Sequence, residues 1–259
     1  MRIARLLLLL LVFSQSPILS GTGWADDPAK AAASQEGLVD RERWTARLET
    51  LSRQIDADPK NLRLHSERGD LHFFLGDFPK AVRDYDRMVE IDAAQDASHW
   101  RRGIALFYAG EFEKAAAQFE RYHSFDQIDR ENGIWRYLSQ RKALGLEKAR
   151  EGLLKYEKDD REPFRDVYRL FAGSIEPAAI LERIDRAEID NDEREKRRFY
   201  AELYIGLNEA VEGRDASAER HLARAVANTW GPRAGYGPHY MWQVGRLHLA
   251  GLKAAPKQP

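Results

Sequence analysis

A spacing of 34 residues recurs in the first half of the chain and constrains its fold more than any other feature of the sequence. Gly69 and Gly103 are 34 positions apart, and so are Gly76 and Gly110. The same offset relates four further pairs: Lys80 and Lys114, Ala81 and Ala115, Tyr85 and Phe119, and Asp92 and Asp126. A fixed period of about 20 to 50 residues is typical of proteins built from stacked copies of one small unit.

Each repeated residue has a physical role in a unit of two packed helices. Gly69 lies inside a predicted helix, where glycine costs about 1 kcal/mol relative to alanine, so we expect a second helix to pack closely against it. Gly76 is placed to end that helix with a positive φ. Pro79 suits the first turn of the next helix, because its missing N–H is not needed there. Ala81 permits close helix crossing, and Tyr85 fills the space beside it.

These units resemble the tetratricopeptide (TPR) consensus in its Arg-Gly variant, whose repeat length is also 34 residues. Full units are predicted at about 62–95 and 96–129, a degenerate unit at 130–158, and a late unit at 199–232 that contains Gly206, Gly213, Ala218, Leu222 and Ala225. The resemblance implies an all-α, right-handed helical solenoid without strands.

Other segments flank these units within a helical domain predicted over 38–252. Leu38–Ile55 has the apolar spacing of a lone helix, and Asp58-Pro59 is placed to end it. Residues 159–198 form an irregular helical insert, with short helices predicted at Phe164–Phe171 and from Pro177 onward. Its mixed-charge stretch from Arg186 to Arg198 is interpreted as a solvated helix face or a loop.

The two ends of the domain are also predicted from local residue types. Residues 26–37 are interpreted as a flexible leader, and residues 253–259 as a disordered tail. Pro238 is expected to begin a closing helix that Gly251 ends. Such a helix would cap the open end of the solenoid, where apolar surface is otherwise exposed.

The first 25 residues have the features of a secretory signal peptide. Arg2 and Arg5 precede the apolar run Leu6–Phe13, which is too short for a bilayer span of about 20 residues. Gly23-Trp24-Ala25 has the small residues that signal peptidase accepts, so we place the cleavage after Ala25. The alternative is an uncleaved anchor. Cleavage predicts a periplasmic or secreted protein without a stable membrane anchor.

Composition and motifs argue against catalysis and against nucleic-acid binding. Lys and Arg number 41 against 42 Asp and Glu, giving a formal net charge of -1 without a basic excess. The absence of cysteine excludes disulfides and thiolate chemistry. His65 and His72 are two helical turns apart, about 10 Å, which is too far to share one metal ion. His65 and His99 occupy equivalent repeat positions and are interpreted as packing residues. No cofactor, metal site or catalytic residue is predicted.

Helical spacing relative to the buried glycines predicts a binding groove on the concave face. The inward stripe is unusually aromatic, and exposed apolar patches often mark partner sites. The alternative is that its members pack against neighbouring helices. The predicted groove residues are Ser66, Asp70, Phe73, Phe74, Trp100, Ile104, Phe107, Tyr108, Leu203 and Leu207, with Ala210 and Val211 at the end of the stripe. Phe74, Trp100, Ile104 and Tyr108 are the expected anchors for a partner.

The order of the parts resembles the NlpI-type envelope proteins of bacteria. Leu170–Ile175 and Leu181–Ile184 are similar to the helical insert of that family, and Phe199-Tyr200 and Ala225–Asn228 to its last repeat. The resemblance implies a lipoprotein, usually homodimeric, that scaffolds peptidoglycan hydrolases and presents them to a processing protease. Thr22 departs from the family pattern, because lipid attachment at that position needs a cysteine thiol.

The sequence therefore predicts a non-enzymatic TPR scaffold of the envelope that binds protein partners, as a monomer or a homodimer. Two other functions stay open: a structural homo-oligomerisation protein whose apolar stripe is the interface, and a binder of small ligands in the irregular middle segment.

The signal sequence generates a testable prediction about maturation. Protein purified from the cell envelope should begin at Asp26 and carry no acyl group, because Thr22 offers no thiol. Intact-mass measurement checks both points together. A mass that retains Met1, or that includes an acyl adduct, would contradict the prediction.

Overall fold

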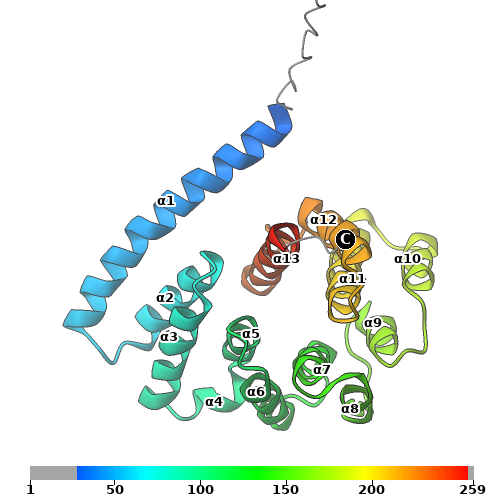
Figure 1. Cartoon of the computed structure of the whole chain (residues 1–259), viewed down its shortest axis with the longest axis horizontal. Coiled ribbons are helices and arrows are strands. Elements are labelled where there is room, and N and C mark those ends of the chain that lie inside the picture. The colour runs from blue at the N-terminus through cyan, green and yellow to red at the C-terminus, as the bar shows by residue number, and fades with distance from the viewer. Residues whose placement is uncertain (1–27, 256–259) are drawn as a thin grey trace, which may run out of the picture. The chain divides into compact units, whose positions relative to one another are not determined.

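The computed structural model describes residues 28–255, and in that range every regular element is a helix (Figure 1). The predicted signal peptide and residues 256–259 lie outside the described residues. The helices are α1 (Pro28–Ala57), α2 (Leu62–Phe74), α3 (Phe78–Ile91), α4 (Gln95–Ser98), α5 (Trp100–Tyr108), α6 (Phe112–Phe125), α7 (Arg130–Leu144), α8 (Leu146–Glu151), α9 (Phe164–Phe171), α10 (Pro177–Arg186), α11 (Asn191–Val211), α12 (Asp215–Ala227) and α13 (Tyr236–Ala254).

The chain divides into two compact units, residues 1–42 and 43–259. In the first unit, α1 begins at Pro28, so the prediction of a flexible leader over 26–37 is wrong from that residue onward. This segment contains four alanines, and alanine has the highest helix propensity of all residues. That propensity offsets the scarcity of apolar residues on which the sequence interpretation relied.

The predicted close contact between glycine and the facing helix is present in three repeats. A Cβ added to Gly69 would lie 2.6 Å from the Tyr85 ring, and one on Gly103 would lie 2.6 Å from the Phe119 ring. Gly206 has the same relation to Leu222, at 2.6 Å. Any larger residue at these positions would push the paired helices apart. The 34-residue register is therefore confirmed as the register of helix packing.

The ends of the repeat helices also follow the predicted signals. Gly76, Gly110 and Gly213 have φ values of 82°, 82° and 78°, which glycine adopts without the steric cost that a Cβ brings. Pro79 lies in the first turn of α3, where its missing N–H leaves no bond unmade. The α2–α3, α5–α6 and α11–α12 pairs are thus helix–turn–helix units of TPR type.

The irregular insert contains the two short helices that the sequence predicts. α9 spans Phe164–Phe171, and α10 begins at Pro177. Most of the mixed-charge stretch is helical, as one of its two interpretations requires, because α11 begins at Asn191, eight residues before the predicted start of the late unit. Glu193 pairs with Lys196 at 3.0 Å and with Arg197 at 2.8 Å, and such pairs one turn apart stabilise a helix.

The second half of α1 packs on the first repeat, as the prediction of a lone stacked helix requires. Trp44 contacts the Phe74 ring at a centroid distance of 5.7 Å, and Arg47 pairs with Glu67 through two hydrogen bonds of 2.6 and 2.9 Å. The helix ends at Ala57, just before Asp58-Pro59. It also begins earlier than the expected Leu38.

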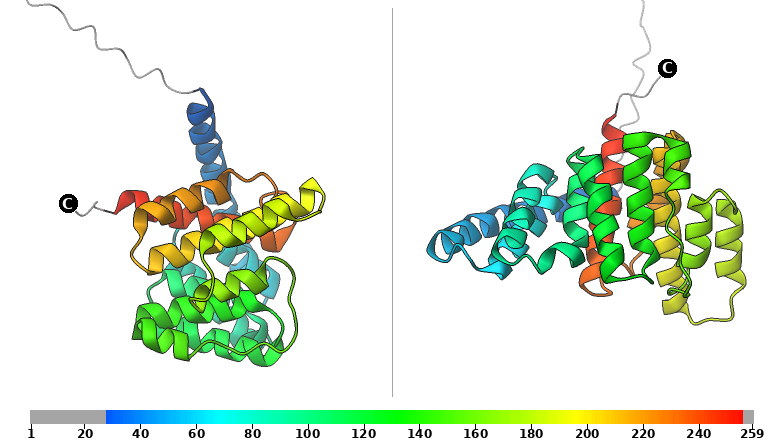
Figure 2. Two further views of the ribbon diagram at one scale, coloured as in Figure 1. Left: turned by 90° about the vertical axis from the view of Figure 1, so that its right-hand side faces the viewer. Right: turned by 90° about the horizontal axis from the view of Figure 1, so that it is seen from below.

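The closing helix differs most from its prediction. α13 begins at Tyr236, passes through Gly251 and ends at Ala254, so neither Pro238 nor Gly251 bounds it. It does not simply cap the last repeat. Within residues 43–255, α2 to α12 follow an arc, and α13 lies on its inner side, against both α12 and α2 (Figures 1 and 2). The last helix therefore contacts the first repeat across the concave face.

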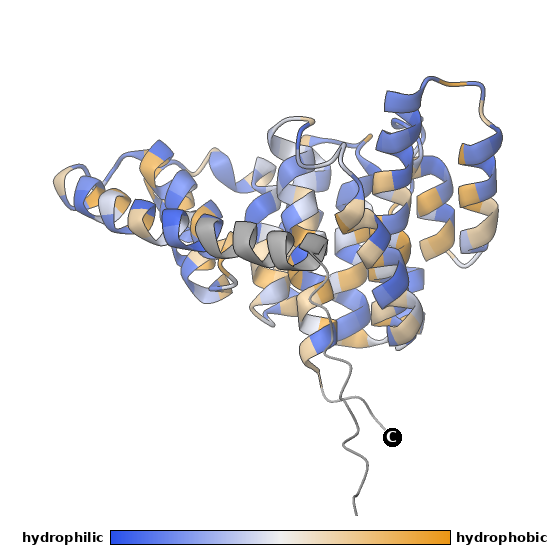
Figure 3. Ribbon diagram, turned by 90° about the horizontal axis from the view of Figure 1, so that it is seen from above, coloured by the Kyte–Doolittle hydropathy of each residue, from blue (hydrophilic) through white to orange (hydrophobic). Residues whose placement is uncertain are grey.

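Hydropathy along the described helices is mixed. Hydrophobic and hydrophilic residues are interspersed along the helices that are coloured in Figure 3. Within residues 28–255, no helix is both long and apolar enough to cross a membrane. The apolar residues of the second unit form one continuous core that includes side chains from the repeats, the insert and α13.

Candidate functional site

Several of the predicted groove residues contact α13, which covers much of the concave face: Phe73, Phe74, Trp100, Tyr108 and Leu203. Within the second unit, the structure corrects the expectation of an open aromatic groove, because most members of the stripe are buried. Asp70, Phe73, Phe74, Ile104, Phe107, Leu203 and Leu207 are buried, whereas Ser66, Trp100, Tyr108, Ala210 and Val211 are partly exposed. The role of these residues in binding a partner stays a prediction.

Tyr240 of α13 is the centre of the contact that covers the first two repeats. Its ring is fully buried and stacks on Phe73 at a centroid distance of 4.9 Å. It also meets Phe74 at 5.4 Å and Trp100 at 5.0 Å, both edge-on. Aromatic pairs in such geometries contribute about 0.5–1.5 kcal/mol each beyond the burial of apolar area. Two of the expected partner anchors, Phe74 and Trp100, thus anchor the chain's own last helix.

The polar members of the stripe are also occupied within the chain. Asp70 accepts hydrogen bonds of 2.6 Å from the hydroxyls of Tyr85 and Tyr236 and from the Arg101 guanidinium. Arg101 also donates to the Ser66 hydroxyl at 3.0 Å. A buried carboxylate is stable only with such donors. Asp70 is therefore a structural residue that ties α2, α3, α5 and α13 together.

The far half of α13 is attached in the same way. Tyr108 shares a hydrogen bond of 2.9 Å with His248, and Arg246 donates to the Phe74 carbonyl oxygen at 2.6 Å. Burial lowers the pKa of His248 to about 4, so this imidazole is neutral near pH 7. The contact between α13 and the repeats therefore keeps its charge state across the physiological range.

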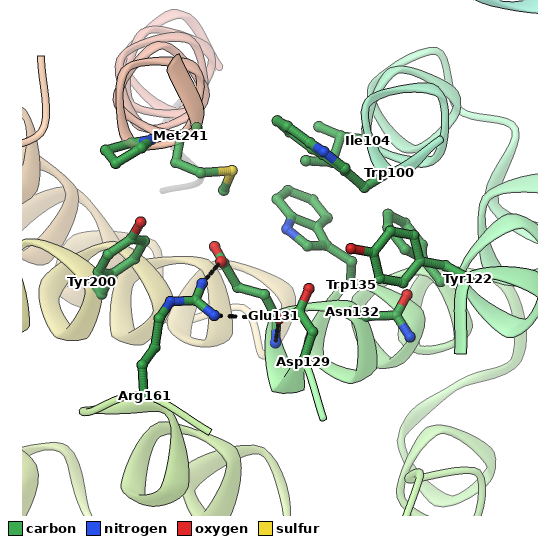
Figure 4. Close-up of a pocket in the computed structure, with 13 residues that line it drawn as sticks. Trp100, Ile104, Tyr122, Asp129, Glu131, Asn132, Trp135, Arg161, Tyr200 and Met241 are labelled. Carbon is green, nitrogen blue, oxygen red and sulfur yellow. Dashed lines mark hydrogen bonds and ion pairs between the residues drawn. The ribbon is translucent and has the colours of Figure 1, made fainter. Parts of the chain in front are cut away.

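Beside the first turns of α13, the concave face retains a cavity of about 280 Å³ (Figure 4). Trp100 and Ile104 are the predicted groove residues that reach it. Its lining comes from α5, α6, α7, α11 and α13 and from the segment before α9: Trp100, Ile104, Phe119, Tyr122, Asp129, Glu131, Asn132, Trp135, Arg161, Tyr200, Gly237, Pro238 and Met241. This cavity is the candidate site.

One wall of the cavity carries a group of charges around Arg161. Its guanidinium pairs with Glu131, lies 3.2 Å from an Asp160 oxygen, and lies 3.6 Å from an Asp129 oxygen. Glu131 also accepts a hydrogen bond from the Tyr204 hydroxyl. With every group ionised, three carboxylates face one guanidinium. The Arg161 side chain is 38% exposed, so this wall reaches solvent.

Burial and crowding of the acids change their ionisation. Burial, followed by the nearby Glu131 charge, raises the pKa of Asp129 to about 7, although Arg161 acts in the opposite direction. Burial also raises the pKa of Glu131, against the stabilising effect of Arg161 and the Tyr204 hydroxyl. An acid whose pKa is strongly shifted inside a cavity marks a candidate functional site.

Sequence reasoning did not find the charged wall. Asp129 and Glu131 follow the last regular repeat, and Arg161 lies in the insert, where the 34-residue period no longer applies. The only available signal was the break in the repeat near residue 130. Cavity walls built from a repeat and an insert together have no spacing that a periodic search could detect.

The histidines occupy structural positions. His65 is buried and lies 3.2 Å from Asp84 and 3.1 Å from the Pro59 carbonyl oxygen, while His99 is buried against the Tyr85 ring. Their interpretation as packing residues is confirmed. Among residues 28–255, no group of three or more His, Asp or Glu side chains is arranged to hold a metal ion.

Comparison with solved structures finds a similarity in fold. The fold is similar to that of a tetratricopeptide repeat protein from Parabacteroides merdae ATCC 43184, with a TM-score of 0.47 and 14% sequence identity over 88% of this chain and 86% of that one. No family model matches the chain, and no curated protein does. From its own repeat geometry, the chain has a TPR-type helical repeat fold, and every regular element in residues 28–255 is a helix. The more specific resemblance to NlpI-type proteins stays a prediction.

The raised pKa of Asp129 generates a testable prediction about stability. Between about pH 4 and pH 7 the folded chain holds a proton on Asp129 that the unfolded chain releases, so the stability from this group falls progressively over that range and is lost once the pH has risen through 7. Asp129→Asn removes the buried charge and keeps a residue that caps α7 well. The variant should melt roughly 2–4 °C above the wild type at pH 8, a shift that about 1 kcal/mol produces in a chain of this size.

The difference in melting temperature should shrink as the pH falls from 8 to 5 and should vanish only near pH 4, where Asp129 is protonated in both the folded and the unfolded wild type. Thermal melts of both proteins over this pH range check this. If the variant is less stable than the wild type at pH 8, or if the difference in melting temperature does not depend on pH, the assignment of a destabilising buried charge to Asp129 is contradicted.

Proposed function

We propose that the protein is an exported TPR-type scaffold that binds a protein partner on its concave face, at the cavity beside α13. The observation that supports the proposal most is the packing of α13 against the concave face of the repeats. The repeats hold a helix through buried aromatic contacts, and the cavity continues that same face without being filled by the chain. TPR-type folds generally mediate protein–protein interactions. No catalytic role belongs to the proposal.

The proposed location is the periplasm or the extracellular space, and the proposed partners are envelope enzymes. The signal sequence before Asp26 supports export. The resemblance of the insert and last repeat to NlpI-type proteins supports recruitment of peptidoglycan hydrolases or of a processing protease. Because position 22 is a threonine and not the cysteine that would carry a lipid, the scaffold would reach its partners in solution.

A specific observation also favours the small-ligand alternative. A cavity of about 280 Å³ lies near the lower limit of small-molecule sites, which begin at about 300 Å³. It fits one side chain of a partner equally well. The scaffold proposal is preferred because the wall formed by Arg161 reaches solvent, where a peptide can enter.

Site-specific photocross-linking in the producing cell tests the proposal. A photoreactive amino acid replaces Trp100 at the cavity or Leu144, which is 58% exposed and outside the cavity lining, as the matched control. A partner held at the cavity should give a discrete cross-linked band from position 100 and not from 144. Folding of each variant is checked by circular dichroism.

Mass spectrometry of the band identifies the protein attached. Equal cross-linking from both positions would show non-specific contact. Correctly folded, exported protein that gives no band at position 100 would contradict the cavity as the partner site. A band made only of a second copy of this chain would support homo-oligomerisation instead.

A further inference from the structure

We infer that the cavity binds the ammonium end of a lysine side chain presented by the partner segment. The inference rests on the proposed function and names the partner chemistry at that same site. Three features of the cavity carry it: an excess of carboxylates over cations, aromatic walls, and buried polar groups that the chain itself leaves unpaired.

The charge balance favours a cation. Asp129, Glu131 and Asp160 surround the single guanidinium of Arg161, so two negative charges stay uncompensated when all four groups are ionised. The oxygens of Glu131 are engaged by Arg161 and Tyr204. The Asp129 carboxylate, by contrast, accepts its one hydrogen bond within the described residues at Oδ1, from the Glu131 backbone N–H at 3.0 Å, and the Arg161 guanidinium lies 3.6 Å from the same oxygen. Oδ2 is therefore the acceptor available to a bound cation.

The walls favour an organic cation on an aliphatic stem over a hydrated metal ion. Trp100, Tyr122, Trp135 and Tyr200 reach the cavity from four helices (Figure 4). The face of an aromatic ring attracts ammonium groups by about 0.5–2 kcal/mol, depending on how well water is excluded. The Met241 side chain extends toward the cavity from α13 and offers an apolar surface for methylene groups.

Asn132 supplies an independent observation on the same wall. Its side chain is only 2% exposed, yet neither its amide oxygen nor its amide nitrogen makes a hydrogen bond within the described part of the chain. A nearby polar group is the Tyr156 hydroxyl: burial raises the pKa of this tyrosine, and the Asn132 amide lies close enough to act in the opposite direction. An unpaired buried amide costs about 1–3 kcal/mol, so a ligand that brings an N–H donor would be favoured here.

Lysine binding should depend on the ionisation of Asp129. The groups that face this carboxylate are Glu131 on α7, Asp160 and Arg161 before α9, Tyr122 on α6, and Tyr156, whose hydroxyl donates to the Asp129 carbonyl oxygen. The cavity residues contributed by α5 and α13 are not ionisable, and Tyr200 of α11 stays protonated because burial raises its pKa. Affinity should therefore rise between pH 6 and pH 8, as Asp129 loses its proton.

Nuclear magnetic resonance of the full mature chain tests the inference, with the indole N–H signals of Trp100 and Trp135 as reporters. The probes are acetyl-Ser-Lys-Ser-amide, the same peptide with norleucine in place of lysine, and n-butylammonium. Norleucine keeps the four-carbon stem and removes only the ammonium group. The lysine peptide should bind at least about tenfold more tightly than the norleucine peptide at pH 8, which corresponds to about 1.4 kcal/mol.

Two variants make the result specific to the cavity. Asp129→Asn should remove the preference for lysine over norleucine, while Leu144→Ala, outside the cavity, should retain it. A merely structural role for Asp129 would lower binding of both peptides equally.

Three results would overturn the inference. Equal binding of the lysine and norleucine peptides, or an unchanged preference for lysine in Asp129→Asn, would show that the Asp129 carboxylate does not bind the ammonium group. Butylammonium that binds as tightly as the lysine peptide would assign the site to a free amine. If photocross-links from position 100 persist alongside equal peptide binding, only this inference fails. If those cross-links are absent as well, the proposed function fails with it.

Discussion

The packing of Tyr240 into the aromatic side chains of the first two repeats is the interaction on which the concave face depends. It joins α13 to Phe73, Phe74 and Trp100, and its hydroxyl lies 3.4 Å from that of Tyr85. A helical repeat contacts mainly its sequence neighbours, so an open solenoid resists bending only weakly. By contrast, α13 contacts both the last repeat and the first. This contact fixes the arc of the second unit and leaves its cavity beside the first turns of α13.

The cavity combines properties that oppose stability. Its walls are largely aromatic, and three carboxylates share one guanidinium. Burial, followed by the nearby Glu131 charge, raises the pKa of Asp129 to about 7. A core selected only for packing would replace these acids with apolar residues, because buried ionic groups are often neutral or costly for stability. Retaining them is consistent with a role in binding. The same carboxylate that destabilises the empty site would be compensated by a cationic ligand.

The sequence predicts much of the fold because the repeat determines local structure and packing together. Gly69 and Gly103 each mark the point where the second helix of a repeat crosses the first, and the repeat spacing implies which aromatic residue faces each glycine. The positive φ values of Gly76 and Gly110 follow from their positions at helix ends. Short helices of the insert were predictable from proline and glycine boundaries. The helix over 28–37 was missed, because alanine propensity there acts without an apolar pattern.

The site was predicted only in part. The stripe containing Trp100 and Ile104 is set by helical spacing, so its concave direction could be derived. Whether that stripe is open depends on where α13 lies, and this follows from long-range contacts such as Tyr236 with Asp70, 166 residues apart. Local patterns contain no information about such a contact. The Glu131–Arg161 wall has the same origin, since the insert folds back on the repeats.

Hydrogen–deuterium exchange of the backbone amides tests most directly the claim that α13 is an integral part of the concave face. A helix of 19 residues without tertiary contacts frays and exchanges rapidly in water. In the intact chain, the amides around Tyr240 and Leu249 should exchange as slowly as those of α5, within roughly tenfold, because they open only with the repeats. Rapid exchange across α13 alongside slow exchange in α5 would contradict the account, since it would show a concave face that is open in solution.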